Sequence, residues 1–338
     1  MEKRHILKLG LIAAVTTAAA TYKIRIKQRW ISLQGKTVVI TGGSRGLGLV
    51  LAREFLHRRA RVALVARDAE ELQNAQRMLS NENVNVYSCD VTQIDQVFDT
   101  FAKIDQELNG IDILVNNAGN IQVGPSETMT PADYRDSLNL HFWAPYFTCS
   151  AVLPGMKKRK NGRIVNISSI GGKISVPHLL PYSVGKFALA GFSEGLRFEV
   201  IKDNIFVTTI YPGLLRTGSP RNAMFKGKHT AEYTWFSISD ALPGVSMSAT
   251  RAAKQVINAC ERGDARAVLS LPAKFAVKLN EIFPEMAAAI LAAVNRFLPS
   301  TGGIGRSSTT GEKSFTSLSP SFLTTLNERA AQQNNQVA

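Results

Sequence analysis

A tyrosine and a lysine four positions apart have the clearest capacity for chemistry in this sequence. They are Tyr182 and Lys186, in a segment of helical character. Side chains four residues apart on a helix project from the same face. A phenol has an ordinary pKa of about 10, too high for a general base at neutral pH, and a neighbouring ammonium lowers that pKa by stabilising the phenolate. The spacing therefore predicts that Tyr182 exchanges a proton with a substrate oxygen.

A serine at the end of an apolar run has a hydroxyl that could act together with this pair. Ser169 lies 13 residues before Tyr182 and follows a segment rich in β-branched residues. A hydroxyl donates a hydrogen bond to an oxygen on which negative charge develops. Ser169 is therefore expected to hold the same substrate oxygen as Tyr182.

A glycine-rich segment indicates a second binding function. The residues 41–48, Thr-Gly-Gly-Ser-Arg-Gly-Leu-Gly, follow the first apolar run and precede an expected helix over residues 49–59. Glycines there permit a tight turn and close approach of a pyrophosphate, whose charge is stabilised at the helix N-terminus. A purely structural turn is the alternative, but the position after a first strand favours dinucleotide binding.

The end of the second apolar run indicates which dinucleotide is bound. An NAD site usually has an acidic residue there for the ribose hydroxyls, whereas this chain has Ala66 followed by Arg67. Arg45, inside the glycine-rich segment, is placed to reach the same region. Two guanidinium groups suit a 2′-phosphate, which predicts NADP; the alternative is that both are solvated surface charges.

The segments around these residues alternate between strand-like and helix-like patterns. Short runs of β-branched and apolar residues occupy positions 37–40, 61–65, 84–87, 111–115, 162–167 and 205–210, each separated from the next by a helical length. This pattern is typical of βαβ units with a parallel sheet buried on both faces. We predict an α/β fold with a Rossmann-like, doubly wound parallel sheet, in one domain over residues 34–270.

Composition excludes several other classes of protein. Of the 338 residues 45% are hydrophobic and 20% charged, which excludes wholesale disorder, collagen and coiled coil. The net charge of +14 would suit nucleic acid, an anionic membrane or a phosphate-bearing ligand. The basic residues 157–160 are expected in a solvated loop, and without interleaved aromatics they predict no nucleic-acid partner. The three cysteines and five histidines lack metal-ligand spacing, which predicts no metal and reduced thiols.

The N-terminal segment, residues 1–33, differs from the middle of the chain. Residues 6–22 are apolar or small apart from Lys8 and have Lys and Arg on both sides. This favours a membrane anchor or interfacial helix, with the downstream domain on the cytoplasmic side. A soluble amphipathic helix and a signal peptide cleaved near residues 18–20 are the alternatives.

The C-terminal extension divides into two parts. Residues 271–299 form an apolar helical segment, which either packs on the domain or faces a membrane. Residues 300–338 are dominated by Ser, Thr, Gly, Asn and Gln, which predicts a polar, mostly flexible tail.

Over residues 35–270 the chain resembles the short-chain dehydrogenase/reductase family. The motifs that carry the resemblance occur in the family's order: TGxxxGxG at residues 41–48, NNAG at 116–119, Ser169, YxxxK at 182–186, and Pro212-Gly213 with Thr217. The resemblance implies a catalytic set of Asn139, Ser169, Tyr182 and Lys186, in which Asn139 holds a water of a proton relay. It also implies cofactor contacts from Gly42, Ser44, Arg45, Gly46, Leu47, Gly48, Arg67, Asp90, Val91, Asn117, Ala118, Gly119, Tyr182, Lys186, Pro212, Gly213 and Thr217.

These features together predict an NADP-dependent oxidoreductase that interconverts an alcohol and a ketone or aldehyde. Residues 214–245 contain Met224, Phe225, Tyr233, Trp235 and Phe236, and are expected to cover an apolar small-molecule substrate, unless these side chains only pack together. We expect a homo-oligomer. The alternatives are a non-catalytic NADP-binding sensor and a sugar-nucleotide epimerase or dehydratase, although the latter usually carry TGxxGxxG and a larger C-terminal domain.

Overall fold

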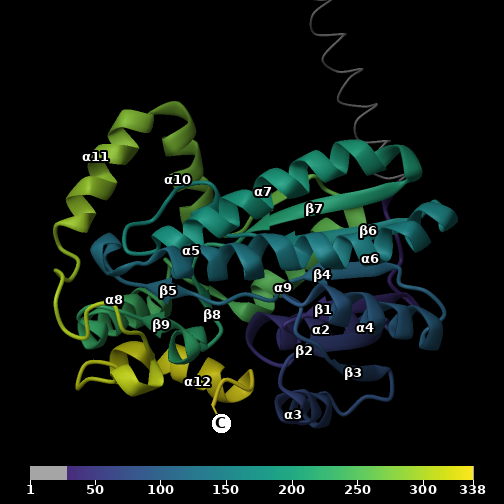
Figure 1. Ribbon diagram of the computed structural model, residues 1–338, viewed down its shortest axis with the longest axis horizontal. Coiled ribbons are helices and arrows are strands. Elements are labelled where there is room, and N and C mark those ends of the chain that lie inside the picture. Colours follow the sequence, from purple (N-terminus) through teal and green to yellow (C-terminus); the bar gives the residue numbers. More distant parts are fainter. Residues whose placement is uncertain (1–28, 338) are drawn as a thin grey trace, which may run out of the picture.

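The computed structural model describes residues 29–337, and its centre is a parallel sheet. Seven strands lie in the order β11-β7-β6-β4-β1-β2-β3 (Figure 1). Their bounds are β1 Thr37–Thr41, β2 Arg61–Ala66, β3 Val84–Ser88, β4 Ile113–Asn116, β6 Gly162–Ile167, β7 Ile205–Tyr211 and β11 Arg266–Val268. The predicted α/β, doubly wound sheet is confirmed, with six strands near their expected positions and the short edge strand β11 added.

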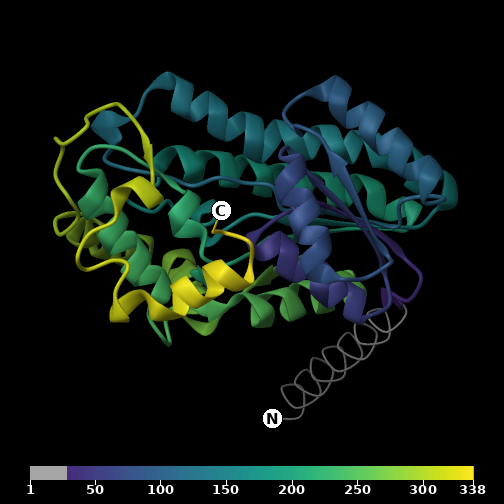
Figure 2. The same cartoon turned by 90° about the horizontal axis from the view of Figure 1, so that it is seen from below.

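Helices cover both faces of the sheet (Figures 1 and 2). One layer comprises α2 Gly46–His57, α3 Ala69–Leu79 and α9 Ala249–Arg262, and the other comprises α4 Ile94–Glu107, α6 Ala144–Arg159 and α7 Leu180–Val200. Successive strand residues serve opposite layers: Val38 and Ile40 pack with the first, and Val39 with the second. The order reverses between β1 and β4, and in such sheets the ligand crevice lies at the carboxyl ends of the strands at that point.

Smaller elements follow the carboxyl ends of the strands. A three-stranded sheet joins β5 Gln122–Val123, β9 Met224–Phe225 and β12 Thr309–Thr310, and a two-stranded one joins β8 Leu215–Arg216 to β10 Met247–Ser248. The helix α8, His229–Ala241, lies beside them. Phe225, Tyr233 and Phe236 are buried together in a separate apolar cluster. Tyr182 and Trp235 pack against this cluster, so it lies beside Tyr182, and cover of a substrate by residues 214–245 stays a prediction.

The apolar segment 271–299 forms two helices that project from the domain (Figure 1). They are α10 Leu271–Ile282 and α11 Pro284–Asn295, separated at Phe283. The break follows from the proline at position 284, which begins a helix well but cannot continue one. Few of their residues are buried, and the side chains of Leu271 and Phe275 are more than two-thirds exposed.

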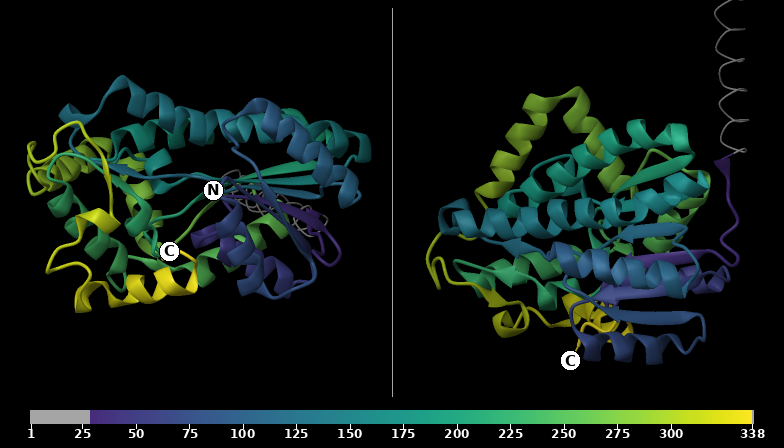
Figure 3. Two further views of the ribbon diagram at one scale, coloured as in Figure 1. Left: turned by 60° about the horizontal axis from the view of Figure 1, so that its bottom comes forward. Right: turned by 45° about the vertical axis from the view of Figure 1, so that its right-hand side comes forward.

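Residues 300–337 do not form the predicted flexible tail. They contribute β12, two single turns and the helix α12, Thr325–Gln333, which packs on α8 (yellow in Figure 3). Asn327, Ala330 and Ala331 are buried there. Composition failed to predict this order because the segment is held largely by polar side chains that find hydrogen-bond partners elsewhere in the chain.

The predictions for the apolar N-terminal segment and for the basic residues 157–160 have different outcomes. The predicted membrane segment, residues 6–22, lies outside the described residues. Within residues 29–337 no helix is long and apolar enough to cross a bilayer. Residues 157–159 form the last turn of α6 rather than a loop, and Lys160 ends that helix in the left-handed conformation.

Candidate active site

The glycine-rich segment forms a tight turn between β1 and α2. The helix begins at Gly46, three residues earlier than expected, so the backbone amides at its N-terminus belong to the turn itself. A β-carbon on Gly42 would lie 2.8 Å from the Cα of Ala118, and one on Gly48 would collide with the Gly42 carbonyl. The turn therefore brings a glycine-lined helix N-terminus to the edge of the sheet, a shape that fits the pyrophosphate of a dinucleotide.

The NNAG motif supports this turn from the end of β4. The side-chain amide of Asn117 donates to the carbonyls of Thr41 and Gly42, at 3.1 and 3.0 Å. The Thr41 hydroxyl accepts from the backbone amides of Asn117 and Ala118, both at 3.1 Å. Asn117 thus fixes the two loops to each other, while Gly119 stays exposed at the crevice.

The structure does not bring the two predicted phosphate-binding arginines into one group. Arg45 forms an ion pair with Glu71 at 2.8 Å and donates to the side-chain oxygen of Asn222 at 3.1 Å. Arg67 is exposed at the end of β2. Asp90 accepts from the backbone amide of Thr92 at 3.0 Å, which is a local turn contact.

The loops after β6 and β7 meet at the same edge of the sheet. The backbone amide of Ile170 donates to the carbonyl of Pro212 at 2.7 Å, which places the Pro212-Gly213 turn next to the Ser169 loop. The Thr217 side chain is buried, and its hydroxyl accepts from the amide of Ser219 at 3.2 Å.

The helix α7 carries Tyr182 and Lys186 in its first two turns. The Lys186 ammonium donates to the carbonyl of Ile167 at 2.9 Å and lies 5.6 Å from the centre of the Tyr182 ring. Ser169 accepts a hydrogen bond from the amide of Gly171 at 3.0 Å. A β-carbon on Gly171 would lie 3.3 Å from the Tyr182 ring and 3.4 Å from the Ser169 hydroxyl, so these two side chains lie side by side. The structure therefore brings Ser169, Tyr182 and Lys186 together at the carboxyl end of β6.

Burial sets the proton affinities of this group. It lowers the pKa of the Lys186 ammonium to about 7. Burial raises the pKa of the Tyr182 phenol, although the hydrogen bond with Ser169 acts in the opposite direction. The expected lowering of the Tyr182 pKa by Lys186 is therefore outweighed, because the charged phenolate is disfavoured where little water reaches it.

Asn139 does not join this group. It begins a π-helical turn, Asn139–Trp143, between α5 (Pro131–Leu138) and α6, and its side chain is exposed. The buried residue of that turn is His141. A π-helical turn adds one residue to the helical repeat and changes which side chains face inward. The implied placement of Asn139 is corrected: His141 lies there instead.

The hydrogen bonds of His141 fix its tautomer. The Ser137 hydroxyl donates to the Pro181 carbonyl at 2.6 Å, so it accepts from Nδ1 of His141 at 3.1 Å. Nε2 is then an acceptor, and the backbone amide of Asn120 donates to it at 3.4 Å. Burial, together with the charge of Lys186, holds the pKa of His141 well below its ordinary value, so the imidazole is neutral.

His141 also contacts the catalytic group directly. Its ring lies 5.3 Å from the Tyr182 ring, edge to face. One sequence signal could have identified it: Ser137 and His141 are four residues apart, the same spacing as Tyr182 and Lys186, and this indicates a shared helix face.

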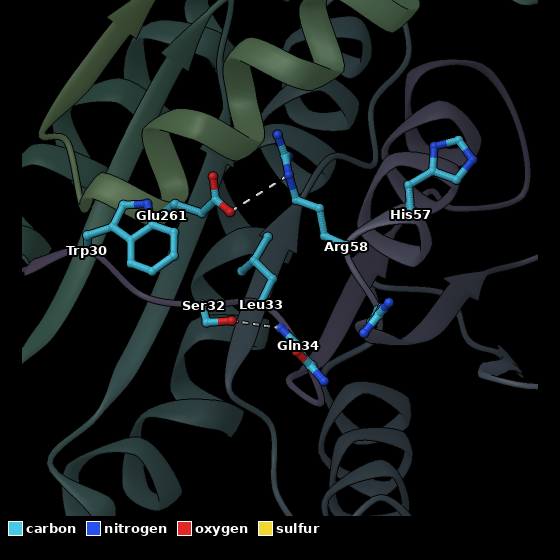
Figure 4. A pocket seen from close by; sticks show the side chains of 8 residues that line it. Trp30, Ser32, Leu33, Gln34, His57, Arg58 and Glu261 are labelled. Carbon is cyan, nitrogen blue, oxygen red and sulfur yellow. Dashed lines mark hydrogen bonds and ion pairs between the residues drawn. The ribbon is translucent and has the colours of Figure 1, made fainter.

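Two hollows lie outside the catalytic group. The first, of about 280 Å³, is lined by Trp30, Leu33, Arg58 and Glu261 (Figure 4). It lies at the opposite end of α2 from the glycine-rich turn, and is therefore remote from the site. The second, of about 620 Å³, lies between the loop that precedes α7 and the helix α11. We call this second hollow the α11 groove.

Comparison with known proteins identifies the family to which the chain belongs. Residues 36–225 match the short chain dehydrogenase family. A dehydrogenase/reductase SDR family protein 7-like from Anopheles gambiae is 38% identical over 200 residues, which cover 57% of this chain and 63% of that protein. The 3-ketodihydrosphingosine reductase of Mus musculus is 32% identical over 210 residues, covering 60% and 63%.

A solved structure extends the comparison to three dimensions. L-sorbose reductase from Gluconobacter frateurii, crystallised with NADPH and L-sorbose, superimposes with a TM-score of 0.63 at 27% identity. The superposition covers 71% of this chain and 97% of the reductase chain. The family match includes more than half of this chain, from the start of β1 to the end of β9. The chain spans less than two thirds of the length of the Anopheles gambiae relative. It belongs to the short-chain dehydrogenase family.

Proposed function

We propose that this protein is an NADP-dependent oxidoreductase that interconverts an alcohol and a ketone or aldehyde at Ser169, Tyr182 and Lys186. The observation that carries the proposal is the meeting of these three side chains at the same edge of the sheet as a glycine-lined helix N-terminus. When bound, the nicotinamide cofactor donates or accepts the hydride. The residues of the chain hold the substrate oxygen and move its proton.

Each side chain has a distinct task in this proposal. Ser169 donates a hydrogen bond to the substrate oxygen. Tyr182 gives its phenolic proton to that oxygen during reduction and takes a proton from it during oxidation. Lys186 also supplies donors for the nicotinamide ribose. His141, neutral and with Nε2 as an acceptor, lies on the same side of Gly119 as the Lys186 ammonium and would take the relay position that the resemblance implied for Asn139.

The proposed preference for NADP rests on charge at the adenosine end. The position directly after β2 holds the exposed Arg67 and no acidic residue, Asp68 caps the start of α3, and Arg45 is in the glycine-rich turn. The structural relative L-sorbose reductase was crystallised with NADPH. Arg45 would leave Glu71 for the 2′-phosphate, since a dianion is the stronger partner for a guanidinium.

We propose an apolar substrate, which would enter through the α11 groove. Val176, Leu180 and Leu291 contribute to its lining, and Leu180 is two residues before Tyr182. The name of one relative, 3-ketodihydrosphingosine reductase, describes action on a long-chain ketone.

The test of activity and substrate class is NADPH oxidation with two sets of carbonyl compounds. We expect turnover with long-chain ketones or aldehydes and much less with polar sugar ketones such as L-sorbose. Turnover restricted to the sugars would contradict an apolar substrate. NADPH binding without turnover of any carbonyl compound would instead indicate the non-catalytic sensor.

We propose membrane association through residues 6–22, with the catalytic domain on the cytoplasmic side. Exposed apolar side chains along α10, α11 and the residues that join and follow them, among them Phe275, Phe283 and Phe297, support a second contact with lipid. Flotation of the full chain with vesicles of phosphatidylcholine and phosphatidylserine tests this. Absence of the intact chain from the vesicle fraction would contradict it.

We also propose a homo-oligomer. An aromatic cluster of Phe142, Trp143, Tyr146 and Phe192 joins the π-helical turn, α6 and α7, and Trp143 and Tyr146 are more than 40% exposed. Large exposed aromatic groups of this kind mark protein interfaces. Light scattering should give a molar mass that is a multiple of the 36.8 kDa of one chain. The variant Trp143→Glu should lower the measured mass to that of the single chain.

A further inference from the structure

The last residues of the chain lie directly on the glycine-rich turn. The backbone amide of Gly46, the first residue of α2, donates to the carbonyl of Asn334 at 2.8 Å. The side-chain amide of Asn335 donates to the carbonyls of Ser44 and Glu71, at 3.0 and 3.3 Å. Figure 2 shows the yellow C-terminal end beside the purple start of the domain. Residues nearly three hundred positions apart are thereby joined at the predicted dinucleotide site.

Gln336 covers the turn where a pyrophosphate would approach. A β-carbon on Gly46 would lie 2.5 Å from the side-chain nitrogen of Gln336, so that amide packs against the bare Cα. Asn222 donates to the side-chain oxygen of Gln336 at 2.6 Å and to its carbonyl at 3.1 Å. Ser44 and Gln336 are each more than 90% buried by this packing. The chain itself therefore fills the space above the helix N-terminus.

The helix α12 anchors this end from behind. Asn327 accepts from the backbone amide of Gly218 at 3.2 Å and donates to Asp240 at 3.1 Å. Glu328 forms an ion pair with Arg221. Gly218 is in the left-handed region, and a β-carbon there would collide with the Cα of Ala331. The helix is thus fixed to the loop after Thr217, the other side of the predicted cofactor site.

We propose that residues 334–337 form an autoinhibitory latch, which must leave the glycine-rich turn before NADP binds. This inference rests on the proposed use of NADP. The Asn334 carbonyl takes the amide hydrogen of Gly46, a group that phosphate oxygens would use, and the Gln336 amide takes the adjacent space. The latch is uncharged, so a pyrophosphate competes with it on favourable terms at the positive end of a helix. The anchored α12 keeps the released latch close to its site.

The latched state also occupies Arg45. Its guanidinium is held by Glu71 and by Asn222, and Asn222 is itself bonded to Gln336. Release of Gln336 frees Asn222, and thereby loosens one of the two contacts that hold Arg45. Binding of the 2′-phosphate and opening of the latch are therefore coupled through Asn222.

The decisive experiment compares NADPH binding to the full chain and to a chain that ends at Gln333. Truncation there keeps the anchored helix α12 and removes only the latch. We expect NADPH to bind the shortened chain about tenfold more tightly, the gain expected if about a tenth of full-length molecules are open. Affinity is measured by NADPH fluorescence, without substrate. Equal or weaker binding to the shortened chain would overturn the latch, and weaker binding would show that these residues clasp bound cofactor.

Two point variants test the latch without shortening the chain, in case the truncated protein fails to fold. Gln336→Ala removes the contacts with Gly46 and Asn222 and should also tighten NADPH binding, by a smaller factor. Gln332→Ala is the matched control, since Gln332 is exposed on α12, and it should leave affinity unchanged. Equal affinity of both variants would overturn the latch.

Hydrogen exchange reports on the latch directly. The backbone amide of Gln336 donates to the Ala331 carbonyl at 2.9 Å, and NADPH should accelerate its exchange if the latch opens. Slower exchange on NADPH binding would overturn the proposal. Failure of every variant to bind NADPH would remove the proposed function together with the latch, whereas failure of the latch alone leaves NADPH binding and turnover intact.

Discussion

His141 and Lys186 converge on one point beside Gly119. A β-carbon on Gly119 would lie 3.2 Å from Nε2 of His141 and 3.5 Å from the ammonium nitrogen of Lys186. Both groups are buried, and burial lowers the pKa of each. Because Nδ1 of His141 donates to Ser137, Nε2 presents a lone pair toward this region. The pair therefore suits proton exchange between a neutral imidazole and an ammonium.

Replacing His141 should separate its acceptor role from simple packing. His141→Asn keeps an oxygen acceptor and should retain activity within about tenfold, whereas His141→Phe should lose about 10²-fold, the scale of a group that moves a proton. Steady-state kcat for NADPH oxidation measures this. Asn139→Ala is the control and should leave kcat unchanged, because that side chain is exposed. A large loss in Asn139→Ala with none in His141→Phe would contradict the assignment.

The buried, neutral His141 should make the protein sensitive to acid. Its pKa in the folded state lies well below 6.5, so below pH 6.5 the unfolded chain binds a proton that the folded chain does not. Stability should then fall as pH falls, by up to about 1.4 kcal/mol per pH unit from this group. Urea unfolding of the parent and of His141→Asn at pH 7 and pH 5 measures it. The variant should lose less stability than the parent, and equal losses would contradict the account.

Lys186 should make the stability of the fold depend on pH in the alkaline range. Its pKa is about 7 in the folded state and about 10.4 in an unfolded chain. Between these values only the unfolded chain binds the proton, so stability should rise with pH by up to about 1.4 kcal/mol per unit. Lys186→Met removes this dependence. Its stability relative to the parent should therefore decrease from pH 7 to pH 9, as measured by urea unfolding, and a constant difference would show that Lys186 is not buried as described.

The preference for NADP should depend on the two arginines. Arg45→Ser with Arg67→Asp should shift binding from NADP toward NAD, because the 2′-phosphate loses its positive partners and the ribose hydroxyls gain a carboxylate. Titration with NADPH and NADH measures the ratio of their affinities. Tighter binding of NADH than of NADPH by the parent would contradict the prediction.

Local patterns were sufficient for the sheet and for much of the site. Strands such as Ile205–Tyr211 are runs of apolar and β-branched residues, and Tyr182 and Lys186 are placed by helical spacing alone. The fold then determines that Ser169 reaches them, since the carboxyl ends of parallel strands share one edge.

Other features were missed. The π-helical turn that brings His141 rather than Asn139 into the site has no pattern in the residues that form it, and only the spacing of Ser137 and His141 pointed to it. The order of residues 300–337 depends on partners such as Gly46 and Asp240, far away along the chain. The raised pKa of Tyr182 reflects burial, which appears only once the chain is folded.

The catalytic role of Tyr182 is the central claim, and Tyr182→Phe tests it most directly. The substitution keeps the ring but removes the hydroxyl that moves the proton. The measurements are kcat and the Kd for NADPH. The account predicts that kcat falls by at least about 10²-fold while the Kd stays nearly unchanged. Retention of more than about a tenth of the parent kcat, well short of the loss expected for a general acid, would contradict the account.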